Sequence, residues 1–225
     1  MKPKLLDLFA GAGGAGRGYM DAGFDVTGVD IEPQPDYPGR FIQADAIAYL
    51  AQHGHEYDAI HASPPCQASS ALTKGTNKGR EYLNLIPATR ALLALHQVPT
   101  VIENVQGSDL RRDLTLCGEM FGLGVIRHRY FECSGFTPIA PEHIKHRGKV
   151  RGWRHGVYYD GPYLAIYGEG GGKGTVKEWQ AAMDMHWTSN RKSIAESIPK
   201  AYTRFIGGQI MQRLESEQAI RDLAA

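Results

Sequence analysis

Cysteine is scarce in this sequence: the 225 residues contain three, at positions 66, 117 and 133. An odd number at unrelated spacings excludes a disulfide framework and favours a reducing compartment. No apolar run is long enough to span a bilayer, and the N-terminus enters a strand-like run without the apolar region of a signal peptide. We therefore expect a cytoplasmic protein without membrane association.

An excess of charge of one sign is also lacking. The formal net charge is +1, which argues neither for nor against nucleic acid, although basic residues gather locally. Hydrophobic residues make up 42% of the chain and charged residues 22%, a balance that predicts a packed globular core rather than disorder. The length allows one large α/β domain, or such a domain with a small appendage.

Short apolar runs alternate with helical periodicity in the first two thirds of the chain. We expect strands at residues 4–9, 25–29, 41–45, 57–62 and 100–102, with helices between them, the last of these at 82–95. This alternation predicts an α/β fold with a doubly wound, mostly parallel, Rossmann-like sheet, which binds ligands at the carboxyl ends of its strands.

The pattern changes after residue 131. Residues 137–154 are rich in Pro, His, Lys and Arg, residues 158–167 suit a hairpin or two strands, and 176–185 and 200–214 read as helices. We therefore divide the chain into a core at 1–131, a small region at 132–175, and C-terminal helices at 176–225 that return to the core.

A glycine turn follows the first expected strand. Gly11, Gly13 and Gly16 have the spacing G-x-G-x-x-G, and Asp30 ends the next strand, where a ribose could donate hydrogen bonds to it. The same spacing serves dinucleotide enzymes, and a plain tight turn is a further alternative. Asp45, at the next strand end, suits either the exocyclic amine of adenine or the N-cap of a helix.

A more specific signal is the turn Ser-Pro-Pro-Cys-Gln at residues 63–67. Two prolines stiffen the backbone after a strand and hold Cys66 at the carboxyl edge of the sheet, whereas a structural cysteine is usually buried in an apolar run. A thiolate there can add to carbon 6 of cytosine, which makes carbon 5 nucleophilic toward a methyl sulfonium.

Three charged residues suit the same reaction. Glu103 ends the neighbouring expected strand, where burial would raise its pKa and let it protonate nitrogen 3 of the ring. Arg127 and Arg129 would point to one face of a strand and clamp the carbonyl oxygen of the base. The alternatives are a helix-start acid for Glu103 and solvated surface positions for the arginines.

The ordered segments 7–14 (Asp-Leu-Phe-Ala-Gly-Ala-Gly-Gly), 64–67 (Pro-Pro-Cys-Gln), 103–105 (Glu-Asn-Val) and 127–129 (Arg-His-Arg) resemble the DNA cytosine-5 methyltransferase family. The resemblance covers about the first 130 residues. It implies a class I S-adenosylmethionine-dependent methyltransferase core, a reduced target-recognition region at 132–175, and double-stranded DNA as the partner of a monomer, with the target base flipped out of the duplex. The compact chain suggests service to a phage or a bacterial mobile element.

Carried over residue by residue, the resemblance assigns catalysis to Cys66, Glu103, Arg127 and Arg129. Ile31 would pack on the adenine of S-adenosylmethionine, and the cofactor contacts would be Phe9, Ala10, Gly11, Gly13, Gly14, Asp30, Ile31, Asp45, Ala46 and Pro65. Gln67 and Ser70 would begin a loop that closes over DNA. The substrate contacts would be Gln67, Ser70, Lys74, Lys78, Arg80, Asn104, Arg147 and Arg151.

Two departures from the family pattern stand out. The region between residues 131 and 176 is short, so its basic, aromatic-containing segment 143–154 predicts a short or degenerate DNA site, unless that segment is an ordinary solvated loop. The C-terminal Gly-Asn-Ala-Val-Pro-like motif corresponds to residues 196–202, in which the asparagine is missing. An unusual sulfonium donor, RNA as substrate, and a catalytically silent DNA-binding role are the alternatives left open.

The sequence predicts no metal site. Cys117, Cys133, His143 and His146 are the candidates for zinc ligands, and their spacing matches no standard zinc pattern.

Overall fold

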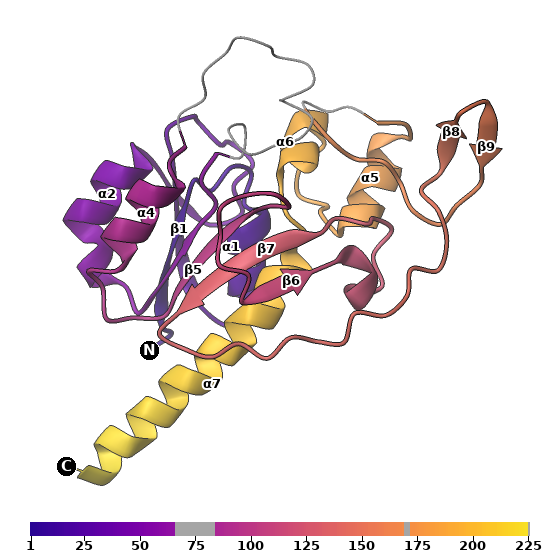
Figure 1. The fold of residues 1–225 in the computed structure, drawn as a ribbon. Helices are drawn as coiled ribbons and strands as arrows, with labels where there is room; N and C mark the ends of the chain where they lie inside the picture. Colours follow the sequence, from indigo (N-terminus) through magenta and orange to yellow (C-terminus); the bar gives the residue numbers. More distant parts are fainter. Residues whose placement is uncertain (66–83, 169–171, 225) are drawn as a thin grey trace.

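The computed structural model describes residues 1–65, 84–168 and 172–224 (Figure 1). Six residues with predicted roles lie outside these ranges: Cys66, Gln67, Ser70, Lys74, Lys78 and Arg80. In the described ranges, no helix has the length and apolar character needed to cross a membrane.

The described strands form one large sheet and one small hairpin. The seven strands of the sheet are β1 (Lys4–Leu8), β2 (Asp25–Asp30), β3 (Arg40–Gln43), β4 (Ala59–Ala62), β5 (Thr100–Val105), β6 (Leu114–Leu116) and β7 (Arg129–Ser134). Their order is β3-β2-β1-β4-β5-β7-β6, and β7 runs antiparallel to both of its neighbours. The predicted doubly wound, mostly parallel sheet is therefore confirmed.

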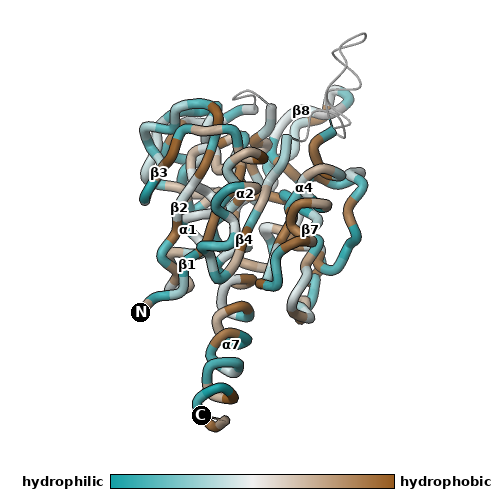
Figure 2. The backbone as a smooth tube through the Cα atoms, turned by 90° about the vertical axis from the view of Figure 1, so that its left-hand side faces the viewer, coloured by the Kyte–Doolittle hydropathy of each residue, from teal (hydrophilic) through white to brown (hydrophobic). Residues whose placement is uncertain are grey.

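Helices cover both faces of this sheet (Figure 1). On one face α1 (Gly14–Asp21) packs against α7 (Lys200–Ala224), and on the other lie α2 (Ala46–His53) and α4 (Ile86–Leu93). Each face has its own core, because alternate residues of a strand point to opposite sides: Leu5 and Val101 belong to one cluster, Leu6 and Ile102 to the other. The helices α5 (Val176–Met183) and α6 (Arg191–Glu196) contribute to the same core cluster as α1. The C-terminal part of α7 extends past the body of the molecule (Figure 2).

The structure corrects several expected boundaries. β5 continues to Val105, so Glu103 lies inside the strand, and α7 continues ten residues beyond the expected end at 214. The hairpin expected at 158–167 lies earlier, as β8 (Gly152–Arg154) and β9 (Val157–Tyr159). Its turn residues His155 and Gly156 have φ of 48° and 78°, the left-handed pair that closes a two-residue hairpin. The glycine was the signal that the sequence-based prediction overlooked.

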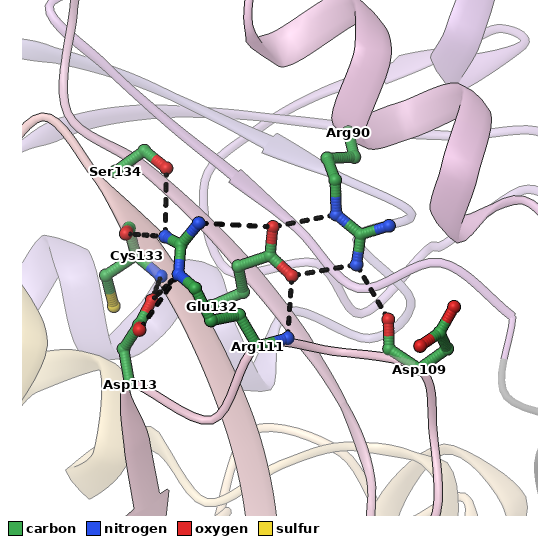
Figure 3. Close-up of polar contacts among 7 residues, drawn as sticks. All are labelled: Arg90, Asp109, Arg111, Asp113, Glu132, Cys133 and Ser134. Atoms are coloured by element: carbon green, nitrogen blue, oxygen red, sulfur yellow. Dashed lines mark hydrogen bonds and ion pairs between the residues drawn. The ribbon is translucent and has the colours of Figure 1, made fainter.

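The antiparallel strand β7 is anchored on the α4 side by charged residues (Figure 3). The guanidinium of Arg90 in α4 donates two hydrogen bonds of 2.8 Å to the carboxylate of Glu132, and the backbone N–H of Arg111 donates a third, of 2.9 Å. Arg111 also pairs with Asp113 at 2.9 Å. These bonds hold the carboxylate ionised, since Arg90 and the Arg111 amide lower the pKa of Glu132 against the effect of burial.

Candidate active site

The site is built around Glu103, a carboxylic acid buried near the carboxyl end of β5. Its side chain faces the same side of the sheet as Arg129, the first residue of β7, and the Arg129 Nε–Glu103 Oε1 distance is 3.1 Å. Burial raises the pKa of Glu103, while Arg129, a hydrogen bond from Ser63 and the more distant Arg127 partly oppose that rise. A carboxyl group in such surroundings can hold a proton and pass it to a base.

The turn after β4 is hydrogen-bonded to β5, the strand that carries Glu103. Asn104 is buried, and its side-chain amide donates a 2.8 Å hydrogen bond to the carbonyl oxygen of Pro64. The side-chain oxygen of Asn104 accepts a 2.9 Å hydrogen bond from the backbone N–H of Val105. The last described residue of the turn is Pro65, which is exposed, and the chain continues from there to Cys66. Asn104, expected to contact the substrate, thus binds the protein's own backbone.

A buried polar chain leads to Glu103 from helix α1. The Tyr19 hydroxyl lies 3.0 Å from His61 Nδ1, and His61 Nε2 lies 2.9 Å from the hydroxyl oxygen of Ser63, which in turn hydrogen-bonds to Glu103. Burial lowers the pKa of His61 to about 3, so the imidazole is neutral. All bonds are satisfied when Tyr19 donates to Nδ1 and Nε2–H donates to Ser63. Sequence reasoning missed His61, whose signal was a lone histidine within an apolar strand.

The two arginines that were expected to point to one face have different partners. Arg127 precedes β7, so strand alternation does not apply to it, and the prediction of a common strand is wrong. It is buried, and its guanidinium donates hydrogen bonds to the carbonyl oxygens of Ile166 and Ala195. Arg127 therefore ties the segment before β7 to the 132–175 region and to α6, whereas Arg129 pairs with the buried acid.

The glycine turn between β1 and α1 adopts an open, left-handed backbone. Phe9, Gly11 and Gly13 have φ of 56°, 48° and 82°, and among the described residues no atom beyond the chain neighbours of Gly11 lies within 4 Å of where its Cβ would stand. The backbone N–H of Gly11 donates a 2.9 Å hydrogen bond to Asp30 Oδ2, and the N–H of Glu32 donates one of 3.0 Å to Oδ1. The turn thus leaves its backbone open to a ligand beside a carboxylate at the end of β2.

The other predicted cofactor residues line the same edge of the sheet. Ile31 is 64% exposed, an apolar side chain that nothing in the described chain covers. Asp45 is the N-cap of α2, as in one of its two predicted roles, because its Oδ1 accepts a 2.8 Å bond from the N–H of Ala48. Ala46 begins that helix and is buried, as is Ala10, whose N–H donates to the Val29 carbonyl oxygen at 3.1 Å.

The C-terminal segment returns to the glycine turn. A Cβ at Gly14 would stand 2.3 Å from the Ile198 carbonyl oxygen, so only glycine allows this approach. The indole N–H of Trp187 donates a 2.8 Å hydrogen bond to the Ala12 carbonyl oxygen. Trp187 is a residue that sequence reasoning missed, since nothing in its neighbourhood matched a motif.

Sequence reasoning also missed a pair of side chains beneath the turn, Tyr37 and Asp7. The Tyr37 ring packs so closely on Gly28 that a Cβ there would stand 2.3 Å from it, and its hydroxyl donates a 3.1 Å bond to Asp7 Oδ2. Asp7 is fully buried, and burial raises its pKa to about 8. Asp7 is therefore protonated at neutral pH and supports the turn as a neutral acid.

The two predicted DNA contacts in the 132–175 region already have partners within the protein. Arg147 forms an ion pair with Glu119 at 2.7 Å, and Arg151 lies 3.3 Å from Glu178. The Tyr163 hydroxyl reinforces the first pair by donating a 2.6 Å bond to the Glu119 carboxylate. Contacts of these arginines with DNA remain a prediction.

The strand order with its antiparallel seventh strand, and the helices on both faces, define this chain as a class I methyltransferase by fold. Among known proteins, it is 31% identical over 123 residues to the type II methyltransferase M.HgiGI of Herpetosiphon aurantiacus, a match that covers 48% of this chain and 95% of that protein. The chain thus belongs to the DNA (cytosine-5) methyltransferase family of type II enzymes.

Two other relatives are matched over a smaller part. M.HgiDI of Herpetosiphon aurantiacus is 33% identical over 122 residues, which are 48% of this chain and 39% of that protein. M.XorII of Xanthomonas oryzae pv. oryzae is 30% identical over 122 residues, 47% of this chain and 29% of that protein. The chain therefore spans well under half of the length of these two type II methyltransferases. No family model matches the chain.

Solved structures share the fold over almost the entire chain. The S. pombe Dnmt2 methyltransferase superposes with a TM-score of 0.66 at 14% identity, covering 95% of this chain and 99% of that one. The Entamoeba histolytica methyltransferase EhMeth gives 0.61 at 12% identity, covering 95% and 99%. At such identities the likeness concerns the fold.

Proposed function

We propose that this protein transfers a methyl group from S-adenosylmethionine to carbon 5 of cytosine in double-stranded DNA, with Cys66 as the covalent nucleophile. The observation that carries the proposal is the buried acid Glu103, paired with Arg129 and hydrogen-bonded to Ser63, three residues ahead of Cys66. A proton donor whose pKa is raised, next to a turn that leads into a thiol, is the combination that activation of cytosine needs.

The chemistry follows from these side chains. The Cys66 thiolate adds to carbon 6, and the electron pair of the 5,6 double bond moves onto the ring while Glu103 protonates nitrogen 3. Carbon 5 would then attack the methyl group, which S-adenosylmethionine would supply as an electrophilic sulfonium substituent, and the methyl–sulfur bond would break with its electron pair left on sulfur. Solvent would take the proton from carbon 5, which would restore the 5,6 double bond and expel the Cys66 thiolate, and the nitrogen 3 proton would return to Glu103. Arg129 would hold the base and limit the rise in the pKa of the acid.

The cofactor would bind along the edge formed by the glycine turn and the end of β2. The open backbone at Gly11 gives room for close approach, and each oxygen of Asp30 accepts one backbone hydrogen bond and keeps a lone pair for a ribose hydroxyl. The exposed side chain of Ile31 would gain a cover if adenine packed on it. Phe9, Pro65 and Asp45 would complete the site.

The partner would be duplex DNA, with the target cytosine flipped from the stack. The region 132–175 would recognise the target, and the helices of 176–225 would close the core, in a monomer working in the cytoplasm of a bacterium or a phage-infected cell. Lys74, Lys78 and Arg80 remain candidates for phosphate contacts outside the described residues.

The test is mass spectrometry of nucleosides from plasmid DNA of cells that express the protein or its Cys66→Ala variant. We expect 5-methylcytosine in the first DNA and none in the second, while calorimetry finds the same affinity for S-adenosylmethionine in both proteins. Retained methylation by the variant would remove the covalent mechanism. A different added mass on cytosine would instead identify another donor.

Substrate class is tested by trapping with fluorocytosine, which cannot lose its carbon 5 substituent and so arrests the covalent adduct. Duplex DNA containing it should give a Cys66-dependent adduct, and RNA of the same sequence should give none. Trapping on RNA alone would overturn the DNA assignment. Absence of both adduct formation and cofactor binding would indicate a silent DNA-binding protein.

A further inference from the structure

Four side chains from three separate segments converge beside the start of β7. Cys117 follows β6, His128 immediately precedes Arg129, and His143 and His146 belong to the loop after β7. Each offers one ligand atom, and the four atoms lie within 4.8 Å of one another. The cluster lies outside the glycine turn and takes no part in the chemistry above.

The distances within the cluster suit a tetrahedral ion. His128 Nε2 and His143 Nε2 are 3.0 Å apart, and Cys117 Sγ is 3.4 Å from His146 Nε2. Zinc–nitrogen bonds of about 2.0–2.1 Å at tetrahedral angles place two ligand nitrogens roughly 3.3 Å apart. The His128–His143 distance is close to this spacing, which suits two ligands of one ion.

The sulfur of Cys117 is oriented by two backbone donors. The backbone N–H groups of Glu119 and Arg127 donate hydrogen bonds to it. Such bonds fix the position of a sulfur, as the neighbours of a metal-bound cysteine do. The carboxylate of Glu119, held by Arg147 and Tyr163, adds negative charge close to His146.

We propose that Cys117, His128, His143 and His146 bind one Zn²⁺ in a structural site. One thiolate and three imidazoles form a mixed sulfur and nitrogen set that suits zinc and leaves no open position for a substrate. On binding, the Cys117 thiol releases its proton to solvent and the three histidines coordinate as neutral rings.

The ion would tie the loop after β7 to the strand that carries Arg129. His128 stands between Arg127 and Arg129, so a bond from its ring to the metal would hold the backbone from which both arginines extend. The ligands His143 and His146 would then fix the start of the basic segment 143–154 against the core. This role is distinct from the proposed methyl transfer and does not depend on it.

Three of the four zinc-ligand candidates in the sequence, Cys117, His143 and His146, come together here. The proposal therefore departs from the expectation of no metal site. That expectation rested on chain spacing, and the spacing is irregular because the ligands come from different elements. The fourth candidate, Cys133, points into the core, where its N–H bonds to Asp113 at 2.8 Å, and His128 stands in its place. Only the fold brings His128 to the cluster.

The test is the metal content of the full-length, untagged protein, measured by plasma mass spectrometry. We expect about one zinc per chain in the wild type and in a control, His55→Gln, which changes an exposed histidine far from the cluster in sequence. His143→Gln and Cys117→Ser should retain less than a tenth of that zinc. Equal zinc in all four proteins would overturn the proposal.

A second measurement needs no variant, in case these fail to fold. Zinc-edge X-ray absorption of the wild type should give one sulfur at about 2.3 Å and three nitrogens at about 2.0–2.1 Å. Cobalt in place of zinc should give the strong visible bands of a tetrahedral thiolate site. A wild type that binds neither metal, or an absorption spectrum without sulfur, would contradict the site. These readouts stand whether or not the protein methylates DNA.

Discussion

Substitution of Asp7 by asparagine should remove a pH dependence of stability that the wild type carries. Asp7 is buried beneath the glycine turn, and its pKa rises from the ordinary 3.8 to about 8. Between these values the folded protein holds a proton that the unfolded chain has lost. The free energy of unfolding must therefore fall as pH rises, by about 1.4 kcal/mol per pH unit.

His61 has the opposite effect over a different range. Its pKa falls from 6.5 to about 3 on burial, so between these values the unfolded chain holds the extra proton and stability rises with pH. The two slopes oppose each other from about pH 4 to pH 6.5, and above pH 6.5 only Asp7 of these two groups still contributes a slope. From pH 6.5 to 8 the contribution of Asp7 should decline by roughly 2 kcal/mol.

The assay is urea denaturation followed by circular dichroism, for the wild type and Asp7→Asn, at half-unit steps from pH 5 to 8. Other groups titrate identically in both proteins, so the difference in unfolding free energy reports Asp7. Between pH 6.5 and 8 the free energy of unfolding of the wild type should fall by roughly 2 kcal/mol relative to that of Asp7→Asn. A difference that is constant with pH, or that changes in the wild type's favour, would refute the protonated state of Asp7.

Three further substitutions test the site. Glu103→Gln should lower kcat for methyl transfer about 10²–10⁴-fold, because the amide cannot protonate the ring; a loss below tenfold in a tritiated-methyl assay would exclude Glu103 as the acid. Asp30→Ala should weaken S-adenosylmethionine binding by about 1.5–3 kcal/mol, and unchanged affinity in calorimetry would mean that the ribose acid lies elsewhere. Trp187→Phe should lower the free energy of unfolding by about 1 kcal/mol through loss of the bond to Ala12; an unchanged urea midpoint would argue against it.

Local signals were enough to predict the parallel half of the fold. Apolar runs that end in glycine, proline or acidic residues located β1 to β5, and Asp45 located the start of α2. The antiparallel β7 was anticipated only as a strand holding Arg127 and Arg129, because its bounds and its register with β5 depend on partners distant in the chain. The misplaced hairpin shows the same limit, since β8 and β9 are short and exposed, without strong alternation.

For the candidate site, the sequence predicted residues better than their partners. The motifs named Glu103 and Arg129 but did not predict their ion pair, and Arg127, predicted to clamp the base with Arg129, binds the carbonyl oxygens of Ile166 and Ala195. The support of Glu103 by His61, and the neutral Asp7 under Tyr37, arise from burial. Burial depends on the whole fold, and a single motif carries no measure of it.

The antiparallel direction of β7 sets a minimum length for the loop that follows it. Ser134 and Arg129 are the two ends of β7, and His143 stacks on His128, next to the Arg129 end. The chain after Ser134 must therefore run back along the length of the strand. That return covers roughly 20 Å, and the nine peptide steps from Ser134 to His143 reach at most about 30 Å. The difference between these two lengths corresponds to about three residues of extended chain. Deletions beyond that number would pull the two histidines apart, whereas insertions would leave them together.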